Sequence, residues 1–357
     1  MGVTDDQDVF GIRARALALV RDMPELLQRA PTPGAAIAVV HGPEVVWAGA
    51  FGAKDRATGE PVTLDTVFEA ASLSKPVFAA VVLLLCERGL LELDTPLSDY
   101  LPEPYLPDEP RLGRITARMV LCHTTGFPNW RRNGEPLRVE AEPGSRFGYS
   151  GEGYVYLQHI VEWRTGRSLQ EVAEAAVFAP LGMAAGSYVW RESYGPRAVK
   201  GHDRDGTPVP KWQPAEGNAA TSLHTTAPDL ARFLGGFLAP GPEGVRRHFD
   251  VASEAMLTAQ VRIDKTLSWG LGWGLEHSPG GDAFWQWGDN SGFKNFAVGY
   301  RDTGLGIVVL TNGDDGLWLC REVVTRVARR PAPTFLAEDG PARLGLTVGR
   351  GRITGGG

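Results

Sequence analysis

Ser72 and Lys75 are the first residues whose types and spacing could carry out chemistry. They lie in the segment Ala71-Ser72-Leu73-Ser74-Lys75-Pro76, directly before the apolar run Val77–Cys86. Pro76 fits the first turn of a helix that starts near Ser72, and a spacing of three residues places the hydroxyl and the amine on one helix face. Beside the apolar run the amine is expected to lose hydration, which lowers the pKa of a lysine. Such a lysine can take a proton from a serine nucleophile.

The same segment has a second interpretation. A helix N-terminus near Ser72 would supply a backbone N–H group for a developing oxyanion. An ordinary helix start, with a lysine whose stem is buried and whose amine reaches solvent, would have the same residues. These residues alone do not decide between the two interpretations.

The segment Ser72-Leu73-Ser74-Lys75, preceded by Phe68-Glu69-Ala70-Ala71, resembles the nucleophile motif of the serine β-lactamase and penicillin-binding-protein superfamily. The resemblance is closest to the class C β-lactamase-like branch, which includes D-alanyl-D-alanine carboxypeptidases, D-amino acid peptidases and family VIII carboxylesterases. It extends over most of the chain, through the segments 115–126, 180–183 and 226–233. These are expected to be structural, and His123 is expected to pack or cap rather than to catalyse.

The second motif implied by the resemblance is at Tyr149-Ser150-Gly151. Tyr149 would be a general base, held at or near phenolate by Lys75, that takes the Ser72 proton and later protonates the leaving group; the alternative is a buried tyrosine that anchors a loop. Gly151 stands where the branch has an asparagine that recognises a substrate amide, which puts amide recognition in doubt. The run Gly148–Glu152 does not satisfy G-x-S-x-G, so a nucleophile elbow is not predicted.

The third motif is best matched by Gln286-Trp287-Gly288. The resemblance then implies that the backbone N–H groups of Ser72 and Asp289 form the oxyanion hole. Gln286 lacks the usual cation of this motif, and the Asp289 carboxylate would repel a substrate carboxylate unless Lys294 compensates. A neutral ester is therefore favoured over a carboxylate-bearing penicillin or peptide. A register shifted by one residue, with Trp287 in the first position, is the alternative.

The elements that must position these residues fall into three parts. A helix over 8–29, strands over 35–41 and 45–51 and a third near 62–68 are expected at the beginning of the chain. A mainly helical stretch follows, with its clearest helices at 152–165, 169–178 and 228–238. Strands at 268–276, 283–286, 295–300 and 306–311 and a helix at 317–330 come last, before a tail that is frayed from about residue 344.

This order predicts a mixed α/β (α+β) fold, in which one antiparallel sheet is built from both chain ends, flanked by terminal helices and interrupted by a helical insertion. The predicted sheet domain comprises residues 1–62 and 260–335, the helical domain 63–259, and the C-terminal tail 336–357.

Composition excludes several classes of protein. The chain has 357 residues, 36 basic against 42 acidic residues and a net charge of −6, which makes nucleic acid an improbable partner. No apolar run approaches the length of a membrane span, and the acidic N-terminus lacks a secretory signal, so a cytoplasmic location is expected. Neither the three cysteines nor the histidines have metal-ligand spacing, and neither a metal nor a cofactor is expected.

The sequence therefore predicts a serine hydrolase that acts on a small-molecule ester through an acyl-enzyme on Ser72. Four tryptophans near the expected cleft segments would suit an apolar substrate group: Trp130, Trp212, Trp285 and Trp287. The alternatives are a β-lactamase or D-amino acid peptidase and, from another class, a ligand-binding member of the fold without activity. The oligomeric state is left open.

Overall fold

The chain forms one large antiparallel sheet that uses strands from both of its ends. The computed structural model describes residues 3–132, 134–238, 252–278, 281–337, 340–349 and 352–355. The eight strands follow the order β2-β1-β10-β9-β8-β7-β6-β5. Their bounds are β1 Gly34–His41, β2 Glu44–Gly52, β5 Val261–Arg262, β6 Leu267–Trp269, β7 Gly274–Ser278, β8 Gly281–Asn290, β9 Phe293–Tyr300 and β10 Leu305–Thr311. The predicted fold class is confirmed.

The early and late strands join where β1 pairs with β10, with Ala35 opposite Thr311. Alternate residues of β10 enter two different cores, as the two-residue period of a strand requires. Val308 and Leu310 pack on the side of the inserted helices, and Ile307 and Val309 pack on the other side. Burial on both faces explains why this strand is a continuous apolar run.

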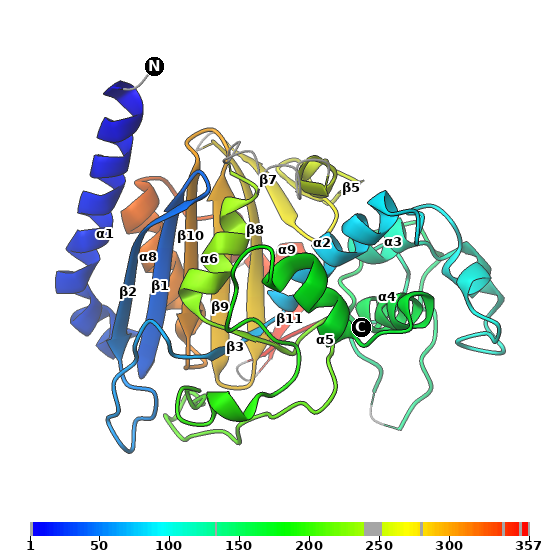
Figure 1. Cartoon of the computed structure of the whole chain (residues 1–357), viewed down its shortest axis with the longest axis horizontal. Helices are drawn as coiled ribbons and strands as arrows, with labels where there is room; N and C mark the ends of the chain where they lie inside the picture. The colour runs from blue at the N-terminus through cyan, green and yellow to red at the C-terminus, as the bar shows by residue number, and fades with distance from the viewer. Residues whose placement is uncertain are drawn as a thin grey trace.

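Helices cover both faces of the sheet (Figure 1). The terminal helices α1 (Val3–Arg29) and α8 (Gly316–Ala328) pack together on one face. On the other face α6 (Ala227–Gly235) lies against β1, β2 and β10. Other helices of the inserted region include α2 (Ser74–Glu87), α3 (Ala117–Leu121), α4 (Gly151–Thr165) and α5 (Leu169–Ala173), which continues as a π-helical turn over Glu174–Phe178.

Two short strands differ from what the sequence predicted. The strand expected near 62–68 lies instead at β3 (Phe68–Ala71), because residues 63–66 close a turn in which the N–H of Thr66 donates to the carbonyl of Thr63 at 3.1 Å. β3 pairs with β4 (Leu223–Thr225), which the helical interpretation of this region missed.

The run 268–276 was expected to be one strand and is two. It is broken between β6 and β7 at Gly272, whose φ of +94° lies in the region that favours glycine. α9 (Gly340–Arg343) comes directly before the tail that was expected to fray, and within that tail β11 (Leu346–Gly349) and β12 (Arg352–Gly355) form a hairpin. The division into a sheet domain, a helical domain and a tail stays a prediction.

No helix among the described residues is both long enough and apolar enough to cross a bilayer. The cytoplasmic location stays a prediction.

β3 approaches the end of β8 closely, and this contact brings the Ser72 segment to the sheet. The side-chain amide of Asn295, on β9, donates to the carbonyl oxygen of Glu69 at 2.9 Å. At Gly288 an added Cβ would overlap the carbonyl oxygen of Ala70. Gly288 is therefore needed for backbone proximity rather than for an unusual backbone conformation.

We expect Gly288→Ala to lower the free energy of unfolding by about 1–3 kcal/mol, because the new methyl group must push β3 away from β8. Urea denaturation of both proteins measures the change. Gly113→Ala is the matched control, since an added Cβ there meets no atom within 4 Å. An equal, small effect of both substitutions would contradict the close approach.

Candidate active site

A sharp turn between β3 and α2 presents Ser72. Ala71 has a φ of +54°, a conformation rarely adopted by residues other than glycine. The Ser74 hydroxyl donates to the carbonyl of Ala71 at 2.5 Å and accepts from the backbone N–H of Leu223 at 2.9 Å. α2 begins at Ser74, two residues later than the sequence indicated. Local hydrogen bonds thus hold the strained residue directly before the serine.

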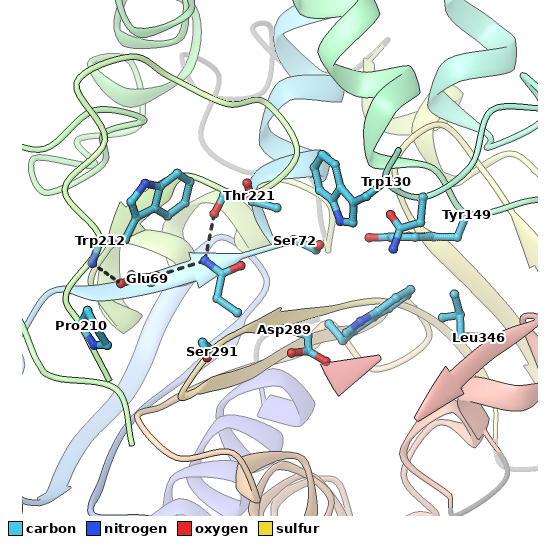
Figure 2. A pocket seen from close by; sticks show the side chains of 13 residues that line it. Glu69, Ser72, Trp130, Tyr149, Pro210, Trp212, Thr221, Asp289, Ser291 and Leu346 are labelled. Atoms are coloured by element: carbon cyan, nitrogen blue, oxygen red, sulfur yellow. Dashed lines mark hydrogen bonds between the residues drawn. The ribbon is translucent and has the colours of Figure 1, made fainter. Parts of the chain in front are cut away.

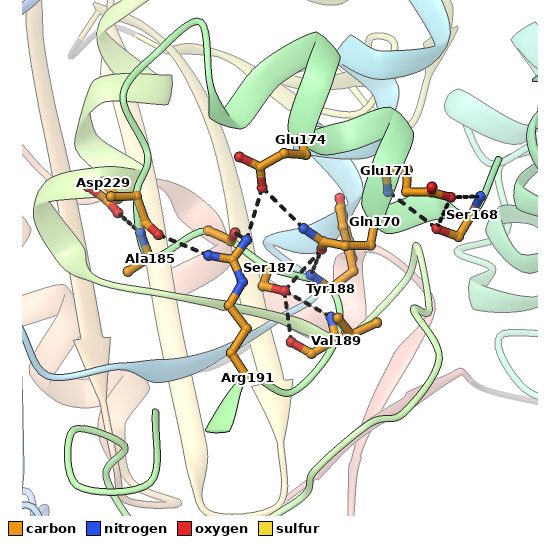
Figure 3. Close-up of polar contacts among 12 residues, drawn as sticks. Ser168, Gln170, Glu171, Glu174, Ala185, Ser187, Tyr188, Val189, Arg191 and Asp229 are labelled. Carbon is orange, nitrogen blue, oxygen red and sulfur yellow. Dashed lines mark hydrogen bonds and ion pairs between the residues drawn. The ribbon is translucent and has the colours of Figure 1, made fainter. Parts of the chain in front are cut away.

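A polar network behind α2 supports this turn (Figure 3). The Tyr188 hydroxyl donates to the carbonyl of Ser74 at 2.8 Å. The backbone N–H of Tyr188 in turn donates to the side-chain oxygen of Gln170 at 2.8 Å, and the Ser187 hydroxyl donates to the same oxygen at 3.0 Å. The segment that follows α5 is thereby tied to the first turn of the helix that carries Lys75.

Lys75 is buried against Ser72. Its Nζ lies 3.0 Å from Ser72 Oγ and donates to the carbonyl of Ala220 at 3.0 Å, and only 1% of the residue is exposed. Burial lowers the pKa of Lys75 to about 7. The predicted drop in pKa is confirmed, and the alternative of a lysine whose amine reaches solvent is wrong.

Tyr149 completes the cluster as a neutral phenol. Its ring lies 4.8 Å from Lys75 Nζ, and its hydroxyl accepts a hydrogen bond of 3.0 Å from Gln286 Nε2. Burial raises the pKa of Tyr149, although hydrogen bonds with Ser72 and Gln286 oppose this change. The expected phenolate is therefore wrong for the free protein. Gln286 carries no charge and Lys75 is near neutrality, so neither supplies the cation that a phenolate needs.

Two aromatic side chains fix the Tyr149 ring. The rings of His123 and Trp287 have centroids 4.3 and 4.6 Å from that of Tyr149. His123 is fully buried and its Nδ1 accepts from the backbone N–H of Ser150 at 3.1 Å. This is the packing role that the sequence indicated.

The third motif takes the register that begins at Gln286. The Gln286 side chain meets Tyr149, whereas Trp287 packs between the rings of Tyr149 and Phe335. Gly288 faces Ala70, and Asp289 reaches the cavity beside Ser72. The role of the Asp289 backbone N–H as an oxyanion donor stays a prediction.

Gly151 lies behind the cavity wall. It begins α4, and its N–H donates to the backbone and side-chain oxygens of Asn129, each at 3.0 Å. The Trp130 indole occupies the space that a side chain at position 151 would need. Gly151 does not line the cavity described next, so any part it takes in binding acts through Trp130.

A cavity of about 420 Å³ opens over Ser72 (Figure 2). Four of its thirteen lining residues are aromatic, Trp130, Tyr149, Trp212 and Trp287, and seven others are polar or acidic. Trp285, which the sequence placed near the cleft, is instead buried in the core, with its ring 5.1 Å from that of Phe335. It lies two residues further from the end of β8 than Trp287 does, and that distance removes it from the cavity.

Sequence reasoning missed seven of the residues that line the cavity: Glu69, Asn129, Pro210, Thr221, Asn290, Ser291 and Leu346. Burial raises the pKa of Glu69 to about 7, although hydrogen bonds from Asn290 Nδ2 and the backbone N–H of Trp212 favour its ionised form. Glu69 belongs to the segment that carried the resemblance, but nothing in the sequence of that segment predicts that its side chain lines the cavity. Leu346 lies in the tail that was expected to fray. Among the described residues, no group of three or more His, Cys, Asp or Glu side chains is arranged to hold a metal ion.

A buried lysine compensates the carboxylate of Asp289. Lys294 Nζ lies 3.0 Å from Asp289 Oδ1 and 2.5 Å from Asp314 Oδ1, and it donates to the carbonyl of Asn290 at 3.0 Å. Only 3% of the Lys294 side chain is exposed. The sequence left open whether Lys294 compensates the charge of Asp289, and the structure shows that it does. The same ion pair ties the last residues of β8 to β9.

The buried Ser–Lys pair, its phenol partner and the helical insertion in an antiparallel sheet define a serine hydrolase. The chain belongs to the Beta-lactamase family, which matches it over residues 19–322. The predicted superfamily and the prediction of a serine hydrolase are both confirmed.

Individual relatives have different activities. Penicillin-binding protein 4 of Amycolatopsis lactamdurans is 29% identical over 310 residues, which cover 79% of this chain and 81% of that protein. Esterase EstB of Burkholderia gladioli is 29% identical over 383 residues, covering 86% and 93%. The solved structure of a beta-lactamase/D-alanine carboxypeptidase from Pseudomonas syringae has a TM-score of 0.76 at 20% identity, covers 90% of this chain and is itself covered completely. That last likeness shows the fold.

We expect Lys294→Met to lower the free energy of unfolding by about 3–5 kcal/mol, because it leaves two buried carboxylates without their cation. Thermal and urea unfolding at pH 7 measure the loss. Lys265→Met is the control, since Lys265 is exposed. A loss no greater than that of the control would show that the ion pairs contribute little.

Proposed function

We propose that the protein is a carboxylesterase that hydrolyses small neutral or apolar esters through an acyl-enzyme on Ser72. The observation that carries this proposal is the contact of 3.0 Å between Ser72 Oγ and the buried amine of Lys75, at the floor of a cavity with aromatic walls. Burial holds the pKa of Lys75 at about 7, so a large fraction of the amine is neutral at neutral pH and can accept a proton.

In the first step Ser72 Oγ attacks the ester carbonyl carbon while the Ser72 proton moves to Lys75 Nζ. The negative charge that develops on the carbonyl oxygen would be stabilised by the backbone N–H groups of Ser72 and Asp289. The bond to the alkoxy group then breaks, and the leaving alkoxide takes a proton. Water next attacks the acyl-enzyme, which releases the carboxylic acid and returns the proton to Ser72.

Tyr149 is proposed to donate the proton that the leaving alkoxide takes, with Lys75 restoring it. Because Gln286 Nε2 donates to the phenol oxygen, the phenol's own proton is free to point toward Ser72, with which Tyr149 also forms a hydrogen bond. Gln286 thus positions Tyr149 as a donor. Lys75 is left as the base of the first step.

The charge of the cavity supports an ester without a carboxylate. Glu69 and Asp289 line it, and none of its lining residues in the described part of the chain is Lys, Arg or His. A substrate carboxylate would find no cation among these residues, because Lys294 is already paired with Asp289, and it would meet Glu69, which is partly ionised at neutral pH. The likeness to an esterase supports the same choice.

We expect short p-nitrophenyl esters to be hydrolysed faster than nitrocefin or D-alanine p-nitroanilide, with all activity lost in Ser72→Ala. Release of product and labelling of Ser72 by a fluorophosphonate are the measurements. Ser98→Ala is the matched control, because Ser98 does not line the cavity. Fast turnover of nitrocefin or the anilide without ester hydrolysis would instead favour a β-lactamase or D-amino acid peptidase.

We expect kcat/KM for a neutral ester to rise with pH through about 7, because Lys75 accepts the Ser72 proton only after losing its own. Lys75→Arg should reduce kcat/KM by at least about 100-fold, because a guanidinium stays protonated at working pH. Glu69 has a pKa of about 7 as well, so Glu69→Gln separates the two groups. A rising limb that disappears in Glu69→Gln would assign it to the carboxyl group rather than to Lys75.

A further inference from the structure

Trp130 forms one wall of the cavity at the N-terminus of α4. Figure 2 shows its indole above Ser72 and beside Tyr149, at the opposite end of the cavity from Glu69. It is 43% exposed, an unusual exposure for so large an apolar side chain. A Cβ added at Gly151 would lie 2.5 Å from the indole. The absence of a side chain at 151 is what makes room for this ring.

Hydrogen bonds fix the backbone on both sides of Trp130. The carbonyl of Asn129 accepts from the N–H groups of Gly151 at 3.0 Å and Glu152 at 3.1 Å. Arg131 binds the Glu152 carboxylate through two guanidinium nitrogens, at 2.9 and 2.7 Å, and its backbone N–H donates to the same carboxylate at 3.0 Å. Glu152 is only 4% exposed. This clamp holds the loop so that a ligand need not order it on binding.

The neighbouring walls at this end are also apolar. Trp287 is held between the rings of Tyr149 and Phe335, at 4.6 and 4.4 Å, and Leu346 lines the cavity at the same end as Tyr149 (Figure 2). The polar side chain of Asn129 is already bound to the N–H of Gly151. The end of the cavity near Trp130 therefore offers the exposed indole of Trp130 beside a leucine, whereas the faces of the Trp287 ring are already covered.

We propose that Trp130 is the specificity-determining residue of this site, and that it stacks on a flat apolar group of the ester, such as a phenyl ring. The proposal rests on the esterase function proposed above and names the substrate class more narrowly. Arg131 and Glu152 act as positioning residues for the indole. An aromatic ring stacks well on an indole, and such pairs contribute beyond the area that they bury.

The test compares esters that differ by one phenyl ring. The first pair is p-nitrophenyl acetate with p-nitrophenyl phenylacetate, and the second is ethyl acetate with benzyl acetate. We expect wild-type kcat/KM to favour the ring in at least one pair. In Trp130→Ala this preference should fall about tenfold, which corresponds to about 1.4 kcal/mol, while the ester of that pair that lacks the additional phenyl ring is affected less.

Three further variants sharpen the result. Gly151→Ala should lower the ring preference in the same pair, because the new methyl group displaces the indole without removing it. Trp130→Phe should restore part of the preference. Trp163→Ala should leave it unchanged, because Trp163, on α4, is 55% exposed and does not line the cavity. A ring preference in Trp130→Ala equal to that of wild type would overturn the proposal.

A second measurement separates this proposal from the esterase function itself. Benzyl and ethyl fluorophosphonates label an active serine without needing turnover, so their relative rates on Ser72 report the ring contact alone. If no ester is hydrolysed but the benzyl reagent labels faster in wild type than in Trp130→Ala, the esterase function fails and the role of Trp130 stands. Equal labelling ratios in both proteins would remove that role even if esters are hydrolysed.

Discussion

The burial of one amine is the constraint on which the rest of the site depends. Lys75 Nζ lies between Ser72 and the carbonyl of Ala220, with the rings of Tyr149 and Tyr154 4.8 and 5.6 Å away. An ammonium group in such surroundings has lost most of its hydration, which is why its pKa falls to about 7. The apolar core around α2, the turn at Ala71 and the aromatic wall at Tyr149 all keep water from it. The chemistry proposed for Ser72 depends on that exclusion.

Three segments that are far apart in the sequence surround this amine. Their departures from the motifs of the family are consistent with one another. Gln286 stands where the resemblance implies a cation, and Tyr149 accordingly remains a phenol. Asp289 brings a carboxylate to the cavity, and Lys294 binds it from the next strand. Each change in charge is balanced by a neighbour close in space. The result is a site with little net attraction for an anion and with broad aromatic walls.

Features that depend on residues close together in the sequence could be predicted. The Ser72–Lys75 contact follows from helical spacing, and the strands and helices with clear periodicity were found within a few residues of their bounds. The Tyr149 phenolate was wrong because sequence does not give the depth of burial, which here raises the pKa of the phenol. Trp285 and Trp287 are both tryptophans on the same face of β8. Only their distance from the end of the strand decides that Trp285 is buried in the core and that Trp287 lines the cavity. Glu69 and Leu346 reach the cavity through tertiary packing, which no local pattern records.

The pairing of β1 with β10 has a consequence for how the molecule assembles. His41 and Leu305 are partners in this ladder, and the whole inserted region, with the serine, the lysine and the tyrosine, lies between them in the chain. Contacts of such large sequence separation form slowly, because closing the intervening loop costs entropy before any pairing energy is gained. During synthesis, β1 and β2 must therefore wait as a hairpin with an unpaired edge until nearly the entire chain has emerged. The cavity over Ser72 is likewise lined by residues of β8 and by Leu346, so it is complete only after the late part of the chain has folded.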